Sequence, residues 1–385
     1  MAQIDLASAA PARPALAERS PLRHVDLPLL LSAGVLATYG LLMIYSSTHR
    51  SLADFGLNPA YYLRRQAIFL VVAAIAMFLA VSIDYRYAKI YAPFIYLSAV
   101  GLLVLVRTPL GHSALGAQRW FQVAGFQLSP SLFSRLALIV MLAAFLSSVK
   151  GEVTLPIVFR AIVLGAIPML LVFIQPDIGT SIILAAILVG LLVVSGTKSR
   201  YLAILAIAAA IAIFGAFHLG VIKAYQIQRI TTFFGKSAND AQTADYNRQQ
   251  AEIAIGAGGL TGRGYLHGTQ TNLDFVPEQH TDFIFTAVGE ELGFVGALVL
   301  VLLFGVVLWR CLRTAMLSKD PFGTFLCVGV ATMIAIQVFV NVGMNIGIMP
   351  ITGIPLPFLS YGGSALIADF IGIGLVLNVH MRRFL

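Results

Sequence analysis

Charged residues are scarce in this chain of 385 residues, making up 11% of the total against 59% hydrophobic residues. The mean hydropathy is +0.89. A water-soluble domain carries about 25% charged residues, so this composition excludes a soluble enzyme. Apolar runs of about 20 residues, each long enough to cross about 30 Å of hydrocarbon, recur along the whole chain. The composition therefore predicts a helical protein that crosses a membrane many times, rather than a domain with a single anchor.

Several chemical signatures are also missing. The two cysteines, Cys311 and Cys327, form neither a disulfide framework nor a zinc-binding spacing. The glycine-rich stretch 256–264 is not followed by Lys-Ser or Lys-Thr, so it is not a nucleotide-binding P-loop. The net charge of +8 comes from basic residues scattered one to three at a time between apolar runs. Such residues fix membrane topology and touch anionic lipid heads, so we expect no nucleic-acid partner.

The apolar runs predict an all-α fold with about ten membrane spans and one large outer loop. The predicted spans cover residues 27–46, 66–84, 88–107, 131–149, 155–174, 178–196, 201–222, 283–310, 322–348 and 362–380. If both termini are cytoplasmic, thirteen Lys and Arg residues fall on the inside, against five in the short outer loops. This bias predicts that both termini are inside.

Outside the spans, three segments differ in character. Residues 1–25, rich in Ala and Pro, are expected to form a disordered cytoplasmic tail rather than a cleaved signal peptide. The remaining residues, 26–383, form one predicted transmembrane domain. Its outer segments 108–130 and 223–280 are long, and loops of such length that are not low in complexity are usually functional.

The end of the large outer loop carries the strongest catalytic candidates. In the stretch 277–285, Thr281 is predicted to cap the following helix, which places Asp282 in its first turn. The alternative is that Asp282 merely completes the cap. Glu290 and Glu291 follow inside the apolar run, where a carboxylate costs about 2.5–3.5 kcal/mol unless it meets water or a partner. We therefore expect this helix to line a polar cavity.

Three other outer segments offer polar groups, each with a simpler alternative. Arg119 and Trp120 could hold a phosphate beside a ring that packs on lipid, although a plain interfacial anchor is the favoured interpretation from these residues alone. Asp177, in the turn before the sixth span, could do no more than cap that span. The loop 350–364, which contains Ser360, is dense in Pro and Gly, and such backbone is tolerated near a membrane where it lines a cavity.

Together these segments suggest a site for a sugar that carries phosphate and a lipid tail. Transfer from a sugar diphosphate with inversion needs one base, which takes the proton of the acceptor hydroxyl. It also needs cations that stabilise the departing diphosphate. The outer segments supply carboxylates and basic groups such as Arg229, Arg248 and Arg263. A carboxylic acid on the leaving-group side is unnecessary, because diphosphate already leaves readily.

Five ordered motifs resemble the SEDS family (shape, elongation, division and sporulation) over residues 26–383. They are GAQRW at 116–120, QPDIGT at 175–180, AIGAGGLTGRG at 254–264, PEQHTDFIFTAVGEELGFVG at 277–296 and TGIPLPFLSYGGS at 352–364. The resemblance implies a glycosyltransferase of the bacterial inner membrane that polymerises lipid II on the outer side. It also implies that Asp282 matches the essential aspartate of the family. The residues that we expect to bind substrate are Arg119, Trp120, Asp177, Arg229, Arg263, Asp274, Glu278, His280, Thr281 and Ser360.

The resemblance carries further expectations. The stretch 352–358 looks like the elongation-type, RodA-like branch of the family rather than the septal branch. A class B penicillin-binding protein, which crosslinks the new strand, is the implied partner. No organic cofactor is implied, and a divalent metal, Mg or Mn, is a candidate. The chain departs from the family at Leu132 and Arg135, where Glu and Lys are usual, and at Asp369, where an amide is usual.

Three alternatives remain: a transporter that flips lipid II, a septal-type polymerase and a non-catalytic scaffold. A flippase needs a path open alternately to both sides and no general base, whereas the polar groups of this sequence gather on one side. Purified protein with labelled lipid II separates these alternatives, because a transporter or a scaffold makes no polymer.

The charge bias gives a testable topology. We expect a cysteine introduced at Ser237, in the large outer loop, to react with a membrane-impermeant thiol reagent in intact cells. A cysteine at Ser318, between two spans on the predicted inner side, is the control and should stay protected. Protection at 237 together with labelling at 318 would reverse the orientation.

Overall fold

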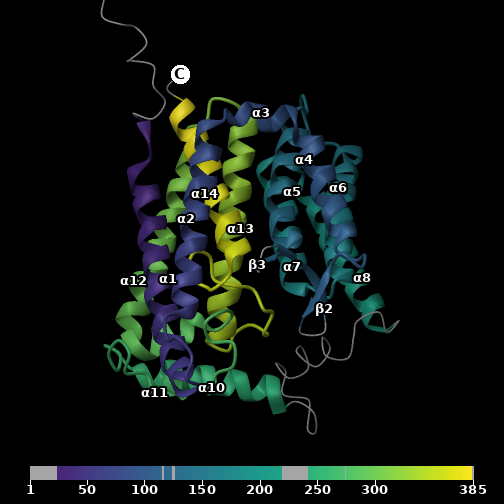
Figure 1. The fold of residues 1–385 in the computed structure, drawn as a ribbon. Coiled ribbons are helices and arrows are strands. Elements are labelled where there is room, and N and C mark those ends of the chain that lie inside the picture. Colours follow the sequence, from purple (N-terminus) through teal and green to yellow (C-terminus); the bar gives the residue numbers. More distant parts are fainter. Residues whose placement is uncertain (1–23, 115–116, 124–125, 219–241, 274, 384–385) are drawn as a thin grey trace, which may run out of the picture.

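The computed structural model describes residues 24–114, 117–123, 126–218, 242–273 and 275–383. The predicted tail 1–25 lies almost entirely outside these residues, as do Arg229, Ser237 and Asp274. The long helices run side by side as a bundle, with α14 and α13 near its centre (Figure 1). The helices are α1 (Leu27–Asp54), α2 (Tyr61–Ser82), α3 (Tyr85–Ile90), α4 (Ala92–Leu105), α5 (Pro130–Ser147), α6 (Leu155–Ile174), α7 (Ile178–Val194), α8 (Ser199–His218), α10 (Gln242–Gly258), α11 (Thr269–Asn272), α12 (Ile284–Met316), α13 (Pro321–Asn345) and α14 (Gly363–Arg382).

The helices match the predicted spans in position. In the described part of the chain, seven helices are long and apolar enough to cross a membrane: α1, α2, α5, α6, α12, α13 and α14. Three shorter apolar helices, α4, α7 and residues 199–212 of α8, lie at the other three predicted spans. The predicted span 88–107 is divided into α3 and α4. Pro93, in the first turn of α4, has no N–H with which to continue the preceding helix.

The prediction of an all-α fold is wrong for the outer segment 108–130, which forms a small antiparallel sheet. Its strands are β1 (His112–Ala114), β2 (Ala117–Val123) and β3 (Phe126–Leu128), with β2 in the middle. Phe121 pairs with Leu128, and Gln122 pairs with Gln127. Trp120 and Phe121 have side chains that favour strands. The hydropathy pattern missed this sheet because its strands are short. The described part of the large outer loop also contains α10 and α11, at the same end of the bundle (Figure 1).

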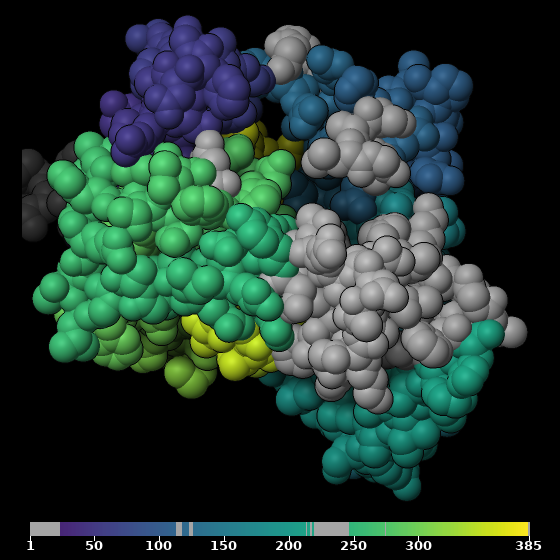
Figure 2. All heavy atoms as spheres, turned by 90° about the horizontal axis from the view of Figure 1, so that it is seen from below, coloured from purple at the N-terminus to yellow at the C-terminus, as the bar shows by residue number. Residues whose placement is uncertain are grey.

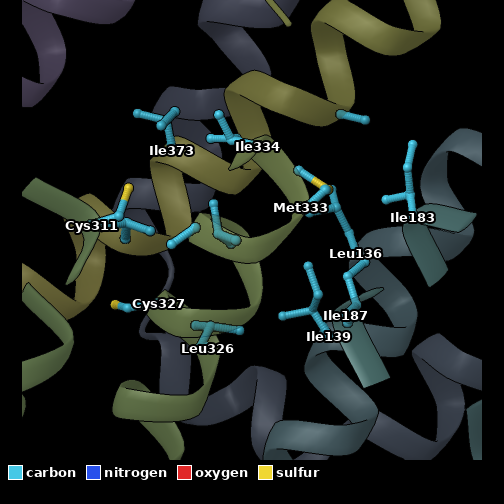
Figure 3. Packing of buried hydrophobic residues seen from close by; sticks show 14 of the residues in the cluster. Leu136, Ile139, Ile183, Ile187, Cys311, Leu326, Cys327, Met333, Ile334 and Ile373 are labelled. Carbon is cyan, nitrogen blue, oxygen red and sulfur yellow. The ribbon is translucent and has the colours of Figure 1, made fainter. Parts of the chain in front are cut away.

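Buried apolar side chains from most of the long helices fill the centre of the bundle, and Figure 3 shows part of this cluster. Leu136 of α5, Ile183 of α7, Met333 of α13 and Ile373 of α14 meet in this layer. Both cysteines are free and buried among these groups. In lipid, helices associate through close van der Waals packing rather than through the hydrophobic effect, so this interdigitation holds the bundle together.

A proline inside α6 leaves one carbonyl that another helix satisfies. Pro168 has no N–H, so the carbonyl of Leu164, four residues earlier, loses its helical donor. The hydroxyl of Tyr96 on α4 donates to that carbonyl at 2.7 Å. The carbonyl of Leu164 is therefore hydrogen-bonded by a neighbouring helix, as a membrane interior requires.

Helix α12 is broken one third of the way along, at Gly293, which has φ 65° and ψ −164°. The segment that follows α10 repairs the break with backbone hydrogen bonds. Phe294 donates to the carbonyl of Gly259 at 2.9 Å, and Gly264 donates to the carbonyl of Glu291 at 2.9 Å. Two further bonds, Val295 to Leu260 and Arg263 to Glu290, complete the exchange. The glycine-rich motif 254–264 thus supplies backbone hydrogen-bond partners to α12 at its break.

Glycine is required in this motif because its backbone nearly touches the backbone of α12. A Cβ at position 262 would lie 2.1 Å from the carbonyl oxygen of Glu291, and one at position 258 would lie 1.9 Å from that of Gly289. Gly262 also has φ 80°, a conformation that side chains disfavour. The glycines serve close packing rather than phosphate binding.

Glu290 and Glu291 do not line a cavity, contrary to the prediction from their position. Both are fully buried. The carboxylate of Glu290 accepts hydrogen bonds from the backbone N–H groups of Gln270 (2.8 Å) and Thr271 (2.9 Å) at the start of α11, and from the hydroxyls of Thr269 and Thr271. Glu291 accepts from the hydroxyl of Ser46 on α1 and from the N–H of Leu266. The two carboxylates therefore fasten the outer segment 264–273 to α12 and α1.

Glu290→Gln tests this fastening. The amide keeps the size of the side chain but loses charge-assisted hydrogen bonds, each worth about 1.5–3 kcal/mol. We expect a clearly lower melting temperature in detergent. Glu152→Gln, which changes a carboxylate in an exposed ion pair with Lys198, is the control and should melt like the wild type. An unchanged melting temperature for Glu290→Gln would contradict the role of this carboxylate in fastening the segment.

Candidate active site

Asp282 lies in a series of turns just before α12, at the end of the bundle that carries α10 and α11. The prediction that Thr281 caps α12 is wrong, because the helix begins at Ile284 and Phe283 occupies its N-cap position. The hydroxyl of Thr281 donates instead to the carbonyl of Glu278, at 3.0 Å. The N–H of Thr286, which a longer helix would direct to Asp282, donates to the carbonyl of Phe283.

Two buried amides on α13 hold the backbone of Asp282 out of the helix. Asn341 donates to the carbonyl of Asp282 at 2.8 Å, and Asn345 donates to it at 3.4 Å. Asn341 also donates to the carbonyl of Ile354 at 2.8 Å. One side chain therefore joins the turn of Asp282 to the last outer loop, residues 346–362. These contacts are all made to backbone carbonyl oxygens.

The last outer loop packs directly against the carboxylate of Asp282. A Cβ on Gly353, which has φ 73°, would lie 3.4 Å from Oδ2 of Asp282. Tyr361 donates its N–H to the carbonyl of His280 at 2.9 Å. The loop thus contacts both His280 and Asp282, the two ends of the stretch 280–282. Asp282 is half-buried where this stretch meets the loop.

Aromatic rings surround the same turn. The ring of His280 lies 4.6 Å from that of Tyr62 and 5.6 Å from that of Tyr361, centre to centre. Burial raises the pKa of the Tyr361 hydroxyl, so this group stays protonated. Arg65 lies over the ring of Tyr61 beside this cluster. The predicted substrate-binding residue His280 is therefore held by rings on α2 and in the last loop.

The predicted residue Ser360 is buried, and the backbone of its own loop uses its side chain. Its hydroxyl accepts from the N–H of Leu356 at 2.8 Å. Gln66 on α2 donates to the carbonyl of Ser360 and accepts from the N–H of Gly362, both at 3.2 Å. These bonds fix the shape of the loop, and substrate binding by Ser360 stays a prediction.

Arg119 and Asp177 meet at a second position in this end of the bundle. The guanidinium of Arg119 donates to the carbonyl of Gln175 at 2.7 Å and to that of Pro176. Asp177 caps α7 by accepting from the N–H of Thr180 at 3.1 Å, as predicted, and substrate binding by Asp177 stays a prediction. Arg119, which β2 carries next to Trp120, therefore fixes the turn ahead of α7. Phosphate binding by Arg119 or Trp120 remains a prediction.

The start of α7 also touches the last outer loop. A Cβ on Gly179 would lie 3.1 Å from the carbonyl oxygen of Thr352 and 2.7 Å from the side chain of Ile354. The loop therefore contacts Asp282 on one side and the Arg119–Asp177 turn on the other. Seen from this end, the surface is hollowed between the green segments around α10 and α12 and the blue segments of the first half of the chain (Figure 2).

The remaining predicted residues are more peripheral. Arg263 is exposed and donates to the carbonyl of Ala257 and the hydroxyl of Thr269. Glu278 is exposed, with φ 53°, and its carboxylate accepts from Thr281. Within the described ranges, no three His, Cys, Asp or Glu side chains gather as metal ligands would. A divalent metal therefore stays a prediction, and no residue is assigned to it.

The sequence analysis did not identify the buried amides that hold the backbone of the site in place. Asn341, Asn345, Gln66 and Gln337 are fully or almost fully buried amides within apolar helices. A polar side chain inside a membrane span is expensive and usually functional. That signal was present in the sequence and could have identified all four.

Comparison with known proteins agrees with this arrangement. The family of FtsW, RodA and SpoVE, described as "Cell cycle protein", matches residues 27–384. Among curated proteins, the peptidoglycan glycosyltransferase MrdB of Escherichia coli K12 is 37% identical over 362 residues, which cover 94% of each chain. The probable peptidoglycan glycosyltransferase FtsW of Trichlorobacter lovleyi is 36% identical over 373 residues, which cover 94% of this chain and 95% of the relative.

Solved structures share the fold over nearly the whole chain. One, described as showing the structural coordination of polymerization and crosslinking by a peptidoglycan synthase complex, has a TM-score of 0.79 at 27% identity. The match covers 94% of this chain and 98% of that one. The rod shape determining protein RodA of Thermus thermophilus has a TM-score of 0.69 at 26% identity, covering 94% and 98%. The chain therefore belongs to the SEDS family, the membrane proteins that include FtsW, RodA and SpoVE.

Proposed function

We propose that this protein is an inverting glycosyltransferase that polymerises lipid II on the outer side of the bacterial inner membrane. The observation that carries the proposal is the setting of Asp282. Its backbone is fixed by Asn341 of α13, and its half-buried carboxylate lies against Gly353 of the last outer loop.

In the proposed reaction, Asp282 acts as general base. Its carboxylate takes the proton of the 4-hydroxyl of the acceptor sugar, and the freed oxygen attacks C1 of the donor. The bond from C1 to the diphosphate breaks on the opposite face, so the configuration inverts and undecaprenyl diphosphate leaves with the electron pair. A fixed backbone beside the base supports this assignment, because positioning within about 1 Å decides the rate of such a step.

Cations near this end are proposed to bind the diphosphates of the substrates. Arg119 and Arg263 are our candidates among the described residues, and Arg229 is a third in the large outer loop. The proposed substrate-binding set is completed by Trp120, Asp177, Glu278, His280, Thr281 and Ser360, with Asp274 a weaker candidate. The reaction needs no organic cofactor, and a divalent metal would add charge beside the leaving group.

The proposed setting is the cytoplasmic membrane, with both termini inside and the active site outside. A class B penicillin-binding protein is the proposed partner, because the similar structure with a TM-score of 0.79 is described as a peptidoglycan synthase complex. A role in elongation rests on the stretch 352–358. Relatives named MrdB and FtsW are similar at 37% and 36% identity, so septal polymerisation is the nearest alternative and a lipid II flippase is a more distant one.

Asp282→Asn is the central test. Asn keeps the size of the side chain and the backbone carbonyl that Asn341 holds, but it cannot accept the proton. We therefore expect a normal melting temperature and polymerisation of labelled lipid II that is about 10²–10⁴-fold slower. Asp54→Asn, which changes an exposed carboxylate at the end of α1, is the control. Polymerisation near the wild-type rate by Asp282→Asn would refute the general base, and absence of polymer from wild-type protein would favour a transporter or scaffold.

Arg119→Ala tests the second position. It removes charge-assisted hydrogen bonds and a proposed diphosphate ligand, so we expect KM for lipid II to rise by about tenfold or more. Arg64→Ala, at an exposed position near the start of α2, is the matched control and should leave KM close to the wild-type value.

Arg119→Lys separates charge from geometry. Lysine keeps the charge but not the planar fork that holds two carbonyls. Recovery of KM in the Lys variant would support diphosphate binding. A Lys variant as poor as the Ala variant would assign Arg119 to the turn alone.

A further inference from the structure

A buried arginine lies among the helices of this bundle. Arg135, in the second turn of α5, has no exposed surface. Its guanidinium donates to the carbonyl of Leu132 at 3.1 Å and to Oε1 of Gln337 on α13, and its Nη2 has no hydrogen-bond partner in the described chain. A charge in such a place needs an opposite charge nearby.

Two carboxylates are close enough to act on Arg135 electrostatically, Asp369 and Asp177. Asp177 is already engaged, since it caps α7 and also accepts from Ser131. Asp369, near the start of α14, is almost fully buried, and its Oδ1 has no hydrogen-bond partner among the described residues. Asp369 is therefore the less engaged of the two carboxylates.

The two charges are joined through an amide rather than by direct contact. Gln337 accepts from Arg135 with its oxygen, and its side chain also interacts with the carboxylate of Asp369. Leu136, Met333 and Ile373, on the same three helices and each within four residues of a member of this network, belong to a buried apolar layer (Figure 3). That layer keeps the charges in a medium of low dielectric constant, where they attract over a longer range.

Asp369 also faces the last outer loop. The backbone N–H of Phe358 points to its carboxylate. Phe358 has φ 64°, a strained conformation for a bulky residue that persists when the surroundings hold it. Its ring packs edge-on against Phe370, the neighbour of Asp369, at 5.4 Å. The same loop places Gly353 beside the Asp282 carboxylate.

We propose that Asp369 is the counter-charge of Arg135, and that this buried pair, joined through Gln337, positions the loop that sets Asp282. Arg135 and Asp369 are positioning residues, since they act through the loop and do not contact the reacting atoms. The positioning half of this proposal rests on the proposed polymerase function, whereas the pairing half does not.

A double-mutant cycle on the full-length protein in detergent tests the pairing. We expect Asp369→Asn and Arg135→Gln each to lower the melting temperature by several degrees. The double variant should melt above the sum of the two losses, because it leaves no buried charge uncompensated. The control cycle of Arg135→Gln with Glu290→Gln, which changes a buried carboxylate on α12 that is bound to α11, should be additive. Additive losses for Arg135 and Asp369 would overturn the pairing, and this readout needs no substrate.

A relocated carboxylate provides a rescue. Position 132 lies one turn before Arg135 on the same helix, so a glutamate there faces the guanidinium. We expect Asp369→Asn to lower kcat per folded molecule by about 10- to 100-fold with little change in KM. We expect Leu132→Glu/Asp369→Asn to regain the melting temperature of the wild type but to regain less of kcat, because the neutral amide accepts the N–H of Phe358 more weakly than the carboxylate does.

The outcomes are separable. An unchanged kcat in folded Asp369→Asn would overturn positioning, whatever the melting data show. If Asp369→Asn cannot be purified, purification of both double variants supports the pairing, and failure of both overturns it. If the wild-type protein makes no polymer, only the polymerase function is refuted. The melting-temperature cycle still measures the coupling between Arg135 and Asp369.

Discussion

The break in α12 at Gly293 is the constraint on which the outer half of the molecule depends. Lipid offers no hydrogen bonds, so the N–H and carbonyl groups that the break frees must be paired by protein. The segment 259–264 does this with four backbone bonds, which demand glycine where the two chains approach. Because the break lies just after Glu290 and Glu291, the same segment brings α11 within reach of those carboxylates.

The last outer loop then connects the two halves of the candidate site. Buried amides on α2 and α13 hold its backbone, and it contacts both the turn of Asp282 and the start of α7. A base placed by backbone hydrogen bonds needs little rearrangement during a reaction, which is the property that electrostatic preorganisation requires. The rigidity of the loop and the chemistry proposed for Asp282 are therefore aspects of one arrangement.

The sequence predicted the positions of the helices and the proximity of the outer motifs, since apolar runs and loop order determine both. It did not predict the sheet at 112–128, whose strands are too short to give a periodic signal. It misplaced the start of α12, because the amides of Asn341 and Asn345 override the local capping preference of Thr281. It also assigned Glu290 to a cavity, because the segment that buries this carboxylate lies twenty residues earlier in the chain. These errors share a cause: in each case the local structure is determined by residues of another helix, strand or loop.

The central position of α14 has a consequence for biosynthesis. This helix is the most buried of the seven candidate spans in the described residues, although it follows the other six in the chain and is therefore synthesised after them. Until it arrives, Gln337 and Arg135 lack the carboxylate of Asp369, and α2 lacks the helix that covers its inner face. The preceding spans must therefore wait in the membrane with polar groups unpaired, shielded by an insertion factor or by one another. Removal of α14 would take away the centre of the bundle, and the remaining helices would be left as an open assembly rather than as a smaller bundle.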